Sequence, residues 1–229
     1  MAVAVRHPPR PERGIIEGFA AHGVATIHEA QERTGLMAAY MRPIFPGARA
    51  SGSAVTVSVP PGDNWMIHVA VELCQEGDVV VVAPTAPVDA GYFGELLATA
   101  MQARGVRGLV IDSGCRDVAA LRDMGFPVWS RCVTAAGTVK ETLGDVNVPV
   151  VCAGQRVVPG DVVVADDDGV VIVDRRRASE VLHNCSEREE KETASRQRYQ
   201  AGELSLDLYG MREGLARKGL VYVDDPPER

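Results

Sequence analysis

Residues 78–133 read DVVVVAPTAPVDAGYFGELLATAMQARGVRGLVIDSGCRDVAALRDMGFPVWSRCV, and they alternate between strand and helix patterns. Residues 79–83 form a continuous apolar run that is typical of a strand buried on both faces. A loop leads to a predicted helix over 95–104, and residues 108–112 form a second buried strand. A short helix over 117–124 and a third strand over 127–133 follow. Strands joined by helices at this spacing predict right-handed parallel crossovers.

The segment before this unit is predicted to contain an arm, short helices and one strand. Residues 1–13 are polar and carry three prolines, so we expect a flexible arm. Apolar residues at helical spacing then predict two short helices, the second with Thr26 as its cap. Alternating small and apolar residues over 52–59 predict a strand, and Asp63 or Asn64 would cap the next helix.

The pattern changes again beyond residue 147. Residues 148–173, VPVVCAGQRVVPGDVVVADDDGVVIV, contain strand-like runs separated by turn signals, which predict an antiparallel meander. Helices are then predicted from 178 to about 201 and over 206–218. These helices lack a wide apolar face, and a helix that is polar nearly all round often contacts a partner chain.

The predicted fold class is therefore α/β, with a parallel-strand unit, an antiparallel meander and C-terminal helices. We expect residues 14–177 to form the core domain behind the arm 1–13. We expect residues 178–229 to form a helical extension that packs on a neighbouring subunit.

Composition excludes several classes of function. The chain has 229 residues, a formal net charge of -7 and 5% aromatic residues, within the globular range. An acidic sequence pI near 5.3 argues against a nucleic-acid or anionic-membrane partner, because both need a surplus of Lys and Arg. No apolar run reaches the length of a membrane span, and the N-terminal residues lack signal-peptide architecture, so a cytoplasmic protein is expected. Five scattered cysteines without a CxxC pair predict neither a disulfide framework nor a thiolate zinc site.

A first candidate anion site is the run Gly94-Glu95-Leu96-Leu97, where the loop after a buried strand becomes a helix. Backbone N–H groups at a helix N-terminus can bind an anion, and glycine allows close approach. The alternative is an ordinary helix start, which this tetrapeptide alone favours.

A second candidate is the run 112–117, DSGCRD, at the carboxyl end of another buried strand, where ligands of α/β sheets gather. Arg116 offers a fork-shaped binder of oxyanions and Asp117 a ligand for a hard cation. Asp117 as a plain N-cap beside a surface arginine is an equally good interpretation of this motif alone. Together with Glu95, the two motifs suit a divalent metal, Mg²⁺ or Mn²⁺, that holds a 2-oxo acid.

Other tempting residues have simpler explanations. His28 and His68 lack a partner at metal-binding spacing, and residues 166–169, DDDG, are better explained as a hairpin turn than as a calcium loop. The chain has no GxGxxG, Walker A or GxSxG motif, so nucleotide and serine-hydrolase functions have no support.

The combination of motifs resembles a known family. GYFGELLATAMQARGVRGLVIDSGCRD (91–117) and FPVWSRCVTAAGTVKETLGDVNVPVV (126–151) are similar to the 4-hydroxy-4-methyl-2-oxoglutarate / 4-carboxy-4-hydroxy-2-oxoadipate aldolases, class II pyruvate aldolases that share a fold with the regulator of ribonuclease E activity A. The resemblance runs from about Gly23 to the motif GELSLDLYGMR (202–212). It implies an α/β/β/α sandwich, homotrimers or hexamers, and a divalent metal at the subunit boundary.

The resemblance also implies roles for particular residues. Asp117 would bind the metal, Arg116 would hold the C2 oxygen of pyruvate, and the amides of Gly94 to Leu97 would bind the substrate carboxylate. Glu95 stands where the family often has Asp in its G-D-L-L motif, and Glu192 matches an acid that the neighbouring subunit supplies. Three further matches are Glu29 as a second such acid and Asn64 and Lys140 as pocket residues.

The implied activity is retro-aldol cleavage of 4-hydroxy-2-oxo diacids to pyruvate plus oxaloacetate or pyruvate, in the degradation of aromatic compounds. The metal and Arg116 would stabilise the enolate, and a water relayed to a carboxylate would deprotonate the C4 hydroxyl. The same chemistry would decarboxylate oxaloacetate as a side activity. The alternatives are a non-catalytic regulator of an RNA-degrading enzyme and a related metal-dependent decarboxylase or isomerase.

Overall fold

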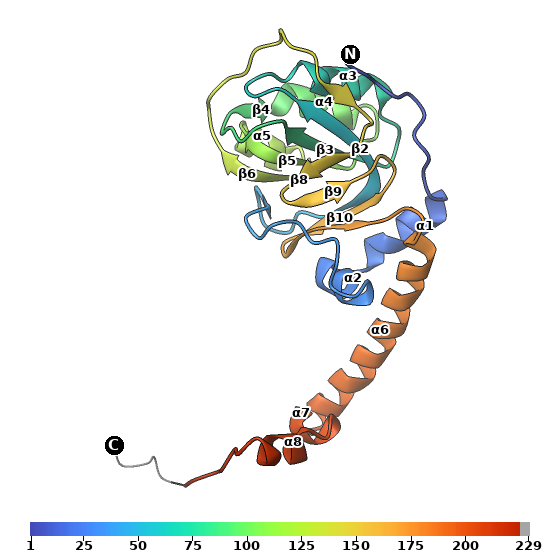
Figure 1. Cartoon of the computed structure of the whole chain (residues 1–229), viewed down its shortest axis with the longest axis vertical. Helices are drawn as coiled ribbons and strands as arrows, with labels where there is room; N and C mark the ends of the chain where they lie inside the picture. Colours follow the sequence, from blue (N-terminus) through green and yellow to red (C-terminus); the bar gives the residue numbers. More distant parts are fainter. Residues whose placement is uncertain (225–229) are drawn as a thin grey trace. The chain divides into compact units, whose positions relative to one another are not determined.

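The computed structural model describes residues 1–224 of the chain (Figure 1). The chain divides into two compact units, Met1–Cys185 and Ser186–Arg229. Among the described residues, no helix is both long and apolar enough to cross a membrane.

A nine-stranded sheet forms the centre of the first unit. The strand order is β1-β6-β5-β3-β2-β10-β11, with β4 paired to β5 and β7 paired to β2. The four strands β2, β3, β5 and β6 are mutually parallel, which confirms the predicted parallel strand direction. The bounds of these four strands are Ala50–Val59, Asp78–Pro84, Gly108–Cys115 and Val128–Val133.

The predicted meander is instead two hairpins in different sheets. Strands β10 (Val162–Asp166) and β11 (Gly169–Val173) extend the large sheet, because β10 pairs antiparallel with β2. Strands β8 (Val150–Cys152) and β9 (Gln155–Val157) form a separate two-stranded sheet. Asp161 ends the first hairpin, since its carboxylate accepts hydrogen bonds from the nitrogens of Val158 (2.8 Å) and Arg175 (3.1 Å). The turn over residues 166–169 joins β10 and β11, as expected.

One segment connects the two edges of the large sheet. The nitrogen of Ile172 in β11 donates to the carbonyl oxygen of Gly35 (2.9 Å). Seven residues later the same segment forms β1 (Arg42–Pro43), which pairs antiparallel with β6. Both edges are thus hydrogen-bonded, which leaves few unpaired backbone groups for aggregation.

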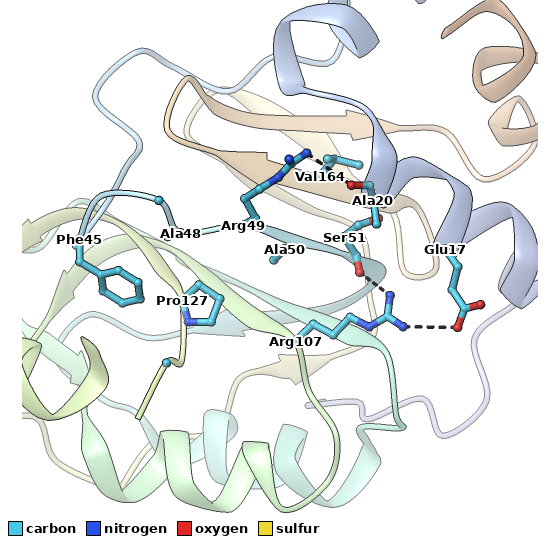
Figure 2. A pocket seen from close by; sticks show the side chains of 12 residues that line it. Glu17, Ala20, Phe45, Ala48, Arg49, Ala50, Ser51, Arg107, Pro127 and Val164 are labelled. Atoms are coloured by element: carbon cyan, nitrogen blue, oxygen red, sulfur yellow. Dashed lines mark hydrogen bonds and ion pairs between the residues drawn. The ribbon is translucent and has the colours of Figure 1, made fainter. Parts of the chain in front are cut away.

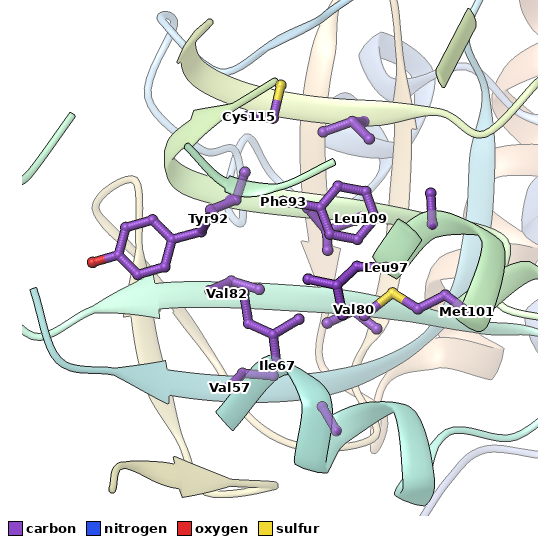
Figure 3. Packing of buried hydrophobic residues seen from close by; sticks show 14 of the residues in the cluster. Val57, Ile67, Val80, Val82, Tyr92, Phe93, Leu97, Met101, Leu109 and Cys115 are labelled. Carbon is purple, nitrogen blue, oxygen red and sulfur yellow. The ribbon is translucent and has the colours of Figure 1, made fainter. Parts of the chain in front are cut away.

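Alternate residues of the central strands pack into two separate cores, because successive strand side chains point to opposite faces. On one face, Val80, Val82 and Leu109 pack against the helices α3 (Trp65–Leu73) and α4 (Glu95–Gln102) (Figure 3). Leu121 of α5 (Val118–Asp123) belongs to the same core. On the other face, the core includes Trp129 and the apolar side chains of β8 and β9. Tight helix packing on β3 and β5 fixes the loops at their carboxyl ends.

The N-terminal helices pack on the large sheet. They are α1 (Arg13–Gly18), the 3-10 helix η1 (Phe19–Ala21) and α2 (Val24–Ala30). Helix α2 packs on β10 and β11, and the two before it pack on β2. The expectation that Thr26 caps the second helix was wrong, because Thr26 lies inside α2. The carboxylate of Asp166 accepts a hydrogen bond from the nitrogen of Val24 (2.9 Å) instead, so a residue 142 positions away supplies the cap.

The N-terminal arm, residues 1–13, is bonded to the core. Val3 and Val5 exchange backbone hydrogen bonds of 2.9 and 3.0 Å with Val146 of β7 (Asp145–Val146). The Arg10 guanidinium forms a 2.9 Å ion pair with the buried Asp78. Backbone and ion-pair contacts therefore hold a segment that composition alone marked as flexible.

The second unit contains most of α6 (Ala178–Gln200), together with α7 (Ser205–Leu208) and α8 (Met211–Arg217). The predicted helix over 206–218 is interrupted at Gly210, whose φ of 60° is left-handed. The first turns of α6 belong to the first unit, where Val181 and Cys185 are buried. From residue 186 to residue 224, no residue is buried.

Candidate functional site

A short strand brings the two candidate motifs together. Strand β4 (Gly91–Phe93) pairs in parallel with the end of β5, where Gly91 lies opposite Gly114 and Phe93 opposite Cys115. The nitrogen of Arg116 then donates to the carbonyl oxygen of Phe93 (2.9 Å). The chain leaves β4 into α4 and β5 into α5, so the starts of both helices lie side by side.

A carboxylate connects the two helix starts. Oδ2 of Asp117 accepts a hydrogen bond from the nitrogen of Glu95 at 3.1 Å. Asp117 occupies the N-cap position of α5, but its side chain caps no amide of that helix. Its φ of 59° is left-handed, a conformation that costs a non-glycine residue about 1–3 kcal/mol and occurs often at functional sites.

Gly94 allows this contact because it has no side chain. A Cβ atom at position 94 would lie 2.2 Å from Oδ2 of Asp117 and 3.1 Å from Cγ of Arg116. The backbone of Gly94 is extended, so close approach explains the glycine and backbone strain does not. The position of the Asp117 carboxylate therefore requires a glycine at position 94.

The start of α4 offers fewer free amides than the sequence suggested. The nitrogen of Glu95 donates to Asp117, so this amide is already used. The amides of Leu96 and Leu97 lie in the first turn, where an N–H group has no acceptor within the helix. The side chain of Leu96 is 84% exposed and that of Leu97 is buried, so a ligand carboxylate has open access from one side.

Arg116 extends over the glycines beside the site. A Cβ atom added at Gly91 would lie 3.6 Å from Cδ of Arg116. A Cβ atom added at Gly137 would lie 4.0 Å from Nη1 of Arg116. Nε of Arg116 lies 3.8 Å from Oδ2 of Asp117, and half of the arginine side chain is exposed. Most of the guanidinium donors are available to a ligand beside the Asp117 carboxylate.

Two further candidates, Asn64 and Lys140, are attached to the same strand end. Nδ2 of Asn64 donates to the carbonyl oxygen of Tyr92 in β4 (2.9 Å), and its backbone nitrogen donates to Val139, next to Lys140 (3.1 Å). Oδ1 of Asn64 is buried and has no hydrogen-bond partner among the described residues. A buried acceptor of this kind usually binds a water or a ligand donor.

Asp63, for which the sequence predicts only a helix cap, also positions a neighbouring loop. Its Oδ2 accepts hydrogen bonds from the nitrogens of Glu141 and Thr142, both at 2.7 Å, and its Oδ1 accepts one from Trp65 (2.9 Å). Burial acts to raise the pKa of Asp63, but the three N–H groups outweigh it and the pKa is lowered. The Pro60-Pro61-Gly62 turn before it was the available signal. Asp63 holds the loop that carries Lys140.

His68 is also close to Lys140. Burial first, and then the Lys140 ammonium, lower the pKa of His68. This histidine, given a structural or surface interpretation from sequence, thus lies near a predicted pocket residue.

Two predicted acids are on other helices. Glu29 is on α2, which contacts β10 and β11, and it pairs with Arg33 at 3.0 Å. Arg116, in contrast, directly follows β5. Glu192 is on α6 in the second unit and pairs with Arg188 at 2.8 Å.

The donor set at Asp117 fits a hydrated hard cation. Among the described residues, no group of three His, Cys, Asp or Glu side chains could hold a metal ion. Mg²⁺ is commonly held by one or two carboxylates, with waters and substrate oxygens completing its shell. Oδ2 of Asp117 is used by Glu95, and the half-exposed carboxylate has a second oxygen to offer. A closed zinc site, with four protein ligands, does not fit.

Cys115, which lies inside the motif, is a packing residue. Its side chain is fully buried and Sγ lies 3.5 Å from Oγ of Ser130. Burial raises the pKa of the Cys115 thiol, so it stays protonated and is a poor nucleophile.

The arrangement can bind a small oxyanion beside a cation. A guanidinium fork, two first-turn amides and an exposed carboxylate lie at the carboxyl ends of β4 and β5. Such groups stabilise negative charge that develops on a substrate oxygen.

Comparison with known proteins gives a consistent result. A protein of Halalkalibacterium halodurans named "Putative 4-hydroxy-4-methyl-2-oxoglutarate aldolase" is 27% identical over 183 residues, covering 80% of this chain and 87% of that protein. A protein of Burkholderia multivorans with the same name is 31% identical over 157 residues, covering 67% and 95%. The crystal structure of Streptomyces coelicolor RraAS2, described as an unusual member of the RNase ES inhibitor RraA protein family, matches with a TM-score of 0.74. It is 28% identical and covers 83% of this chain and 99% of its own.

The family model described as RraA-like, Aldolase/RraA, matches residues 24–172. This range includes both strand-end motifs, Asn64 and Lys140, and it ends before α6. Since the match covers more than half of the sequence, the chain belongs to the RraA-like family.

Proposed function

We propose that the protein is a divalent-metal-dependent aldolase that cleaves 4-hydroxy-2-oxo diacids to pyruvate and a second 2-oxo acid. The observation that carries this proposal is the contact between Asp117 and the start of α4, which sets Arg116 beside two first-turn amides. The substrates are 4-carboxy-4-hydroxy-2-oxoadipate and 4-hydroxy-4-methyl-2-oxoglutarate, and oxaloacetate decarboxylation is a side activity. The names of the relatives support the aldolase class.

Each group has a place in this reaction. The amides of Leu96 and Leu97 bind the C1 carboxylate of the substrate, because first-turn N–H groups favour anions. Arg116 donates to the C2 oxygen, which becomes an enolate oxygen when the C3–C4 bond breaks. Oδ1 of Asn64 accepts a hydrogen bond from a substrate hydroxyl or from a water.

Mg²⁺ or Mn²⁺ at Asp117 would act as a Lewis acid on the C2 carbonyl oxygen. The proton of the C4 hydroxyl passes, through water, to a carboxylate. The first candidate for this carboxylate is Glu95, which follows Gly94 in the same chain. The second candidate is Glu192 of a neighbouring subunit. Lys140 attracts the distal carboxylate of the diacid, and support for this role comes from Asp63, which holds the loop that carries Lys140.

Pyruvate release tests the proposal. Purified protein is incubated with each hydroxy-oxo diacid and Mg²⁺ or Mn²⁺, and pyruvate is measured by coupling to lactate dehydrogenase. We expect release that disappears in Asp117→Ala. Release no faster than without protein, for both diacids and both metals, would reject the aldolase.

The alternative is a non-catalytic regulator of an RNA-degrading enzyme. The favouring observation is the fold shared with RraAS2, whose description places it in a family of RNase ES inhibitors. A second alternative is another metal-dependent 2-oxo acid decarboxylase on the same scaffold. The regulator would bind and inhibit a ribonuclease E homologue in the absence of any diacid, and a dedicated decarboxylase would act on oxaloacetate without cleaving either diacid.

A further inference from the structure

A cavity lies at the opposite end of β5 from the candidate site around Asp117 (Figure 2). Arg107 directly precedes β5 and lines this cavity, whereas Arg116 directly follows the strand. The eight residues of β5 lie between the two arginines, so nine steps of about 3.3 Å join them, which is about 30 Å along the strand. The cavity, of about 640 Å³, therefore does not belong to the site around Asp117. Its volume is within the range of small-molecule sites, about 300–1,000 Å³.

Two arginines give this cavity a positive character. Nη2 of Arg49 donates to the carbonyl oxygens of Ala20 (3.4 Å) and His22 (3.2 Å). Nη1 of Arg107 donates to the carbonyl oxygen of Ser51 (2.9 Å), and its Nη2 is 3.5 Å from Glu17. Both guanidinium groups point toward the helical segment that carries Glu17 and Ala20 (Figure 2). Carbonyl contacts orient a guanidinium but do not neutralise it.

Arg49 is the less neutralised of the two. No carboxylate among the described residues forms an ion pair with it, and Glu17 is shared between Arg107 and Arg13. An arginine has five N–H donors, and the carbonyl contacts use few of them. The remaining donors suit a carboxylate, sulfonate or phosphate oxygen.

Apart from Glu17 and Ser51, the rest of the lining is apolar. Phe45 and Pro127 lie next to each other on one side of the cavity (Figure 2). Ala48, Ala50 and Gly125 line it without filling it. An apolar wall beside two cations fits a molecule with a flat apolar body and one anionic group.

The face of β2 becomes polar where it meets this cavity. Alternate residues of the strand, from Val55 to Val59, are valines in the helix-side core, but positions 51 and 53 on the same face are buried serines. Oγ of Ser51 donates to Ile16. Oγ of Ser53 has no partner among the described residues and lines an adjoining cavity of about 330 Å³, which shares Glu17 and Arg107 with the larger one. A buried hydroxyl without a partner usually binds a water or a ligand atom.

We propose that this cavity is a second ligand site, which binds a small organic anion with its charged group on Arg49 and Arg107 and its apolar body against Phe45 and Pro127. The site is independent of the proposed aldolase reaction. It lies at the amino ends of β2 and β5, whereas ligands of the reaction bind at the carboxyl ends of β4 and β5.

The test is a fluorescence titration of the full chain with 8-anilinonaphthalene-1-sulfonate, a probe with this chemistry. We expect a saturable component that weakens tenfold or more in Arg49→Gln and in Arg107→Gln, since each variant removes charge-assisted hydrogen bonds to the sulfonate. N-phenyl-1-naphthylamine, which has the same rings without the sulfonate, should bind this site at least tenfold more weakly.

Two further variants separate binding from folding. Ala20→Trp places a large side chain at an exposed position on the cavity rim, so we expect it to block the probe with both arginines present. Arg122→Gln removes an exposed arginine that does not line the cavity, and the titration should stay unchanged. Thermal melting confirms that each variant is folded.

Three results would overturn the proposal. The first is a titration that is the same in wild type, Arg49→Gln and Ala20→Trp. The second is equal affinity for the neutral analogue. The third is the absence of a saturable probe component together with a larger mass by light scattering in wild type than in Arg49→Gln. That result would show that the cavity is an interface between copies of the chain.

Discussion

Oδ2 of Asp117 lies 3.1 Å from the backbone nitrogen of Glu95, so a residue at the start of α5 caps the first turn of α4. The contact fixes the relative position of the Arg116 guanidinium and the first-turn amides. Helix N-termini stabilise anions, and the Asp117 carboxylate is itself the first anion bound there. A substrate carboxylate would occupy the neighbouring amides.

Gly94→Ala is predicted to disrupt this contact. The new Cβ would lie 2.2 Å from Oδ2 of Asp117, so the carboxylate must move away from the Glu95 nitrogen. We expect pyruvate release to fall at least tenfold. The thermal melting temperature should change little, because the side chains of Arg116 and Asp117 are half-exposed. The matched control is Gly137→Ala beside the same site, where a Cβ meets only Nη1 of Arg116 at 4.0 Å. Equal activity of the two variants would contradict the steric role of Gly94.

Arg116→Ala should lower kcat more than it raises KM. The charge on the C2 oxygen develops only in the transition state, and loss of one such donor costs about 10²–10³ in kcat. Arg116→Lys keeps the charge but loses the planar fork, so we expect partial rescue. Steady-state kinetics with both diacids measure the split. A kcat within a few-fold of wild type, with only KM raised, would show that Arg116 merely binds substrate.

The parallel unit could be predicted because its signals are local. Continuous apolar runs, four valines in β3 and Leu-Val-Ile in β5, mark these as doubly buried strands, and the glycines after them mark the loops. The runs around Gly94 and Arg116 were therefore placed at strand ends. Their contact through Asp117 could not be predicted, since it depends on the three-residue strand β4 and on a left-handed aspartate.

Long-range contacts account for the remaining differences. Asp166 caps α2 from 142 residues away, and Val146 pairs with the arm through Val3 and Val5. Composition predicts flexibility for a segment with three prolines. It carries no information on the distant strand with which the segment pairs. The break at Gly210 was a local signal, but one glycine inside a helical pattern does not by itself end a helix.

Activity is predicted to require a divalent cation and no Schiff base. The candidate ligands of a cation at Asp117 are oxygen atoms, and the site contains no lysine buried at a strand end, Lys140 being exposed. EDTA should abolish pyruvate release and Mg²⁺ or Mn²⁺ should restore it. Borohydride in the presence of pyruvate should leave the protein mass unchanged. A covalent adduct in the mass spectrum would instead identify a lysine-dependent aldolase.

Asp63→Asn is predicted to lower stability at neutral pH and to flatten its acid dependence. The amide cannot replace a carboxylate that accepts three backbone N–H groups, so we expect a loss of about 1–3 kcal/mol. Because the folded-state pKa of Asp63 is lowered, its contribution is present above the unfolded pKa, about 3.9, and is lost as the pH falls through the folded value. Urea unfolding at pH 7 and pH 3 should show a smaller difference between wild type and variant at pH 3. A constant difference would exclude titration of Asp63 as the cause.

Glu192 is predicted to complete the active site of a neighbouring subunit. No residue from 186 to 224 is buried, yet this segment exposes Leu204, Tyr209, Val221 and Tyr222, as expected of a surface that contacts a partner chain. A carboxylate near the outer shell of a cation orients bound water, and its loss typically costs about 10–100-fold. We therefore expect Glu192→Ala to lower pyruvate release by that factor, with Glu213→Ala, which removes an exposed helical acid of the same unit, as the control.

Mixing chains tests whether Glu192 acts between subunits. Arg116→Ala and Glu192→Ala chains, each of low activity, are dissociated and reassembled together. If Arg116 and Glu192 of one site come from different chains, some mixed interfaces regain both residues, and activity should rise above that of either variant alone. Reassembly of each variant by itself controls for recovery during refolding, and native mass spectrometry with one chain isotope-labelled verifies that mixed oligomers form. Verified mixed oligomers without recovery, or a monomer by light scattering, would leave the Glu192–Arg188 pair as an ordinary ion pair on the surface of α6.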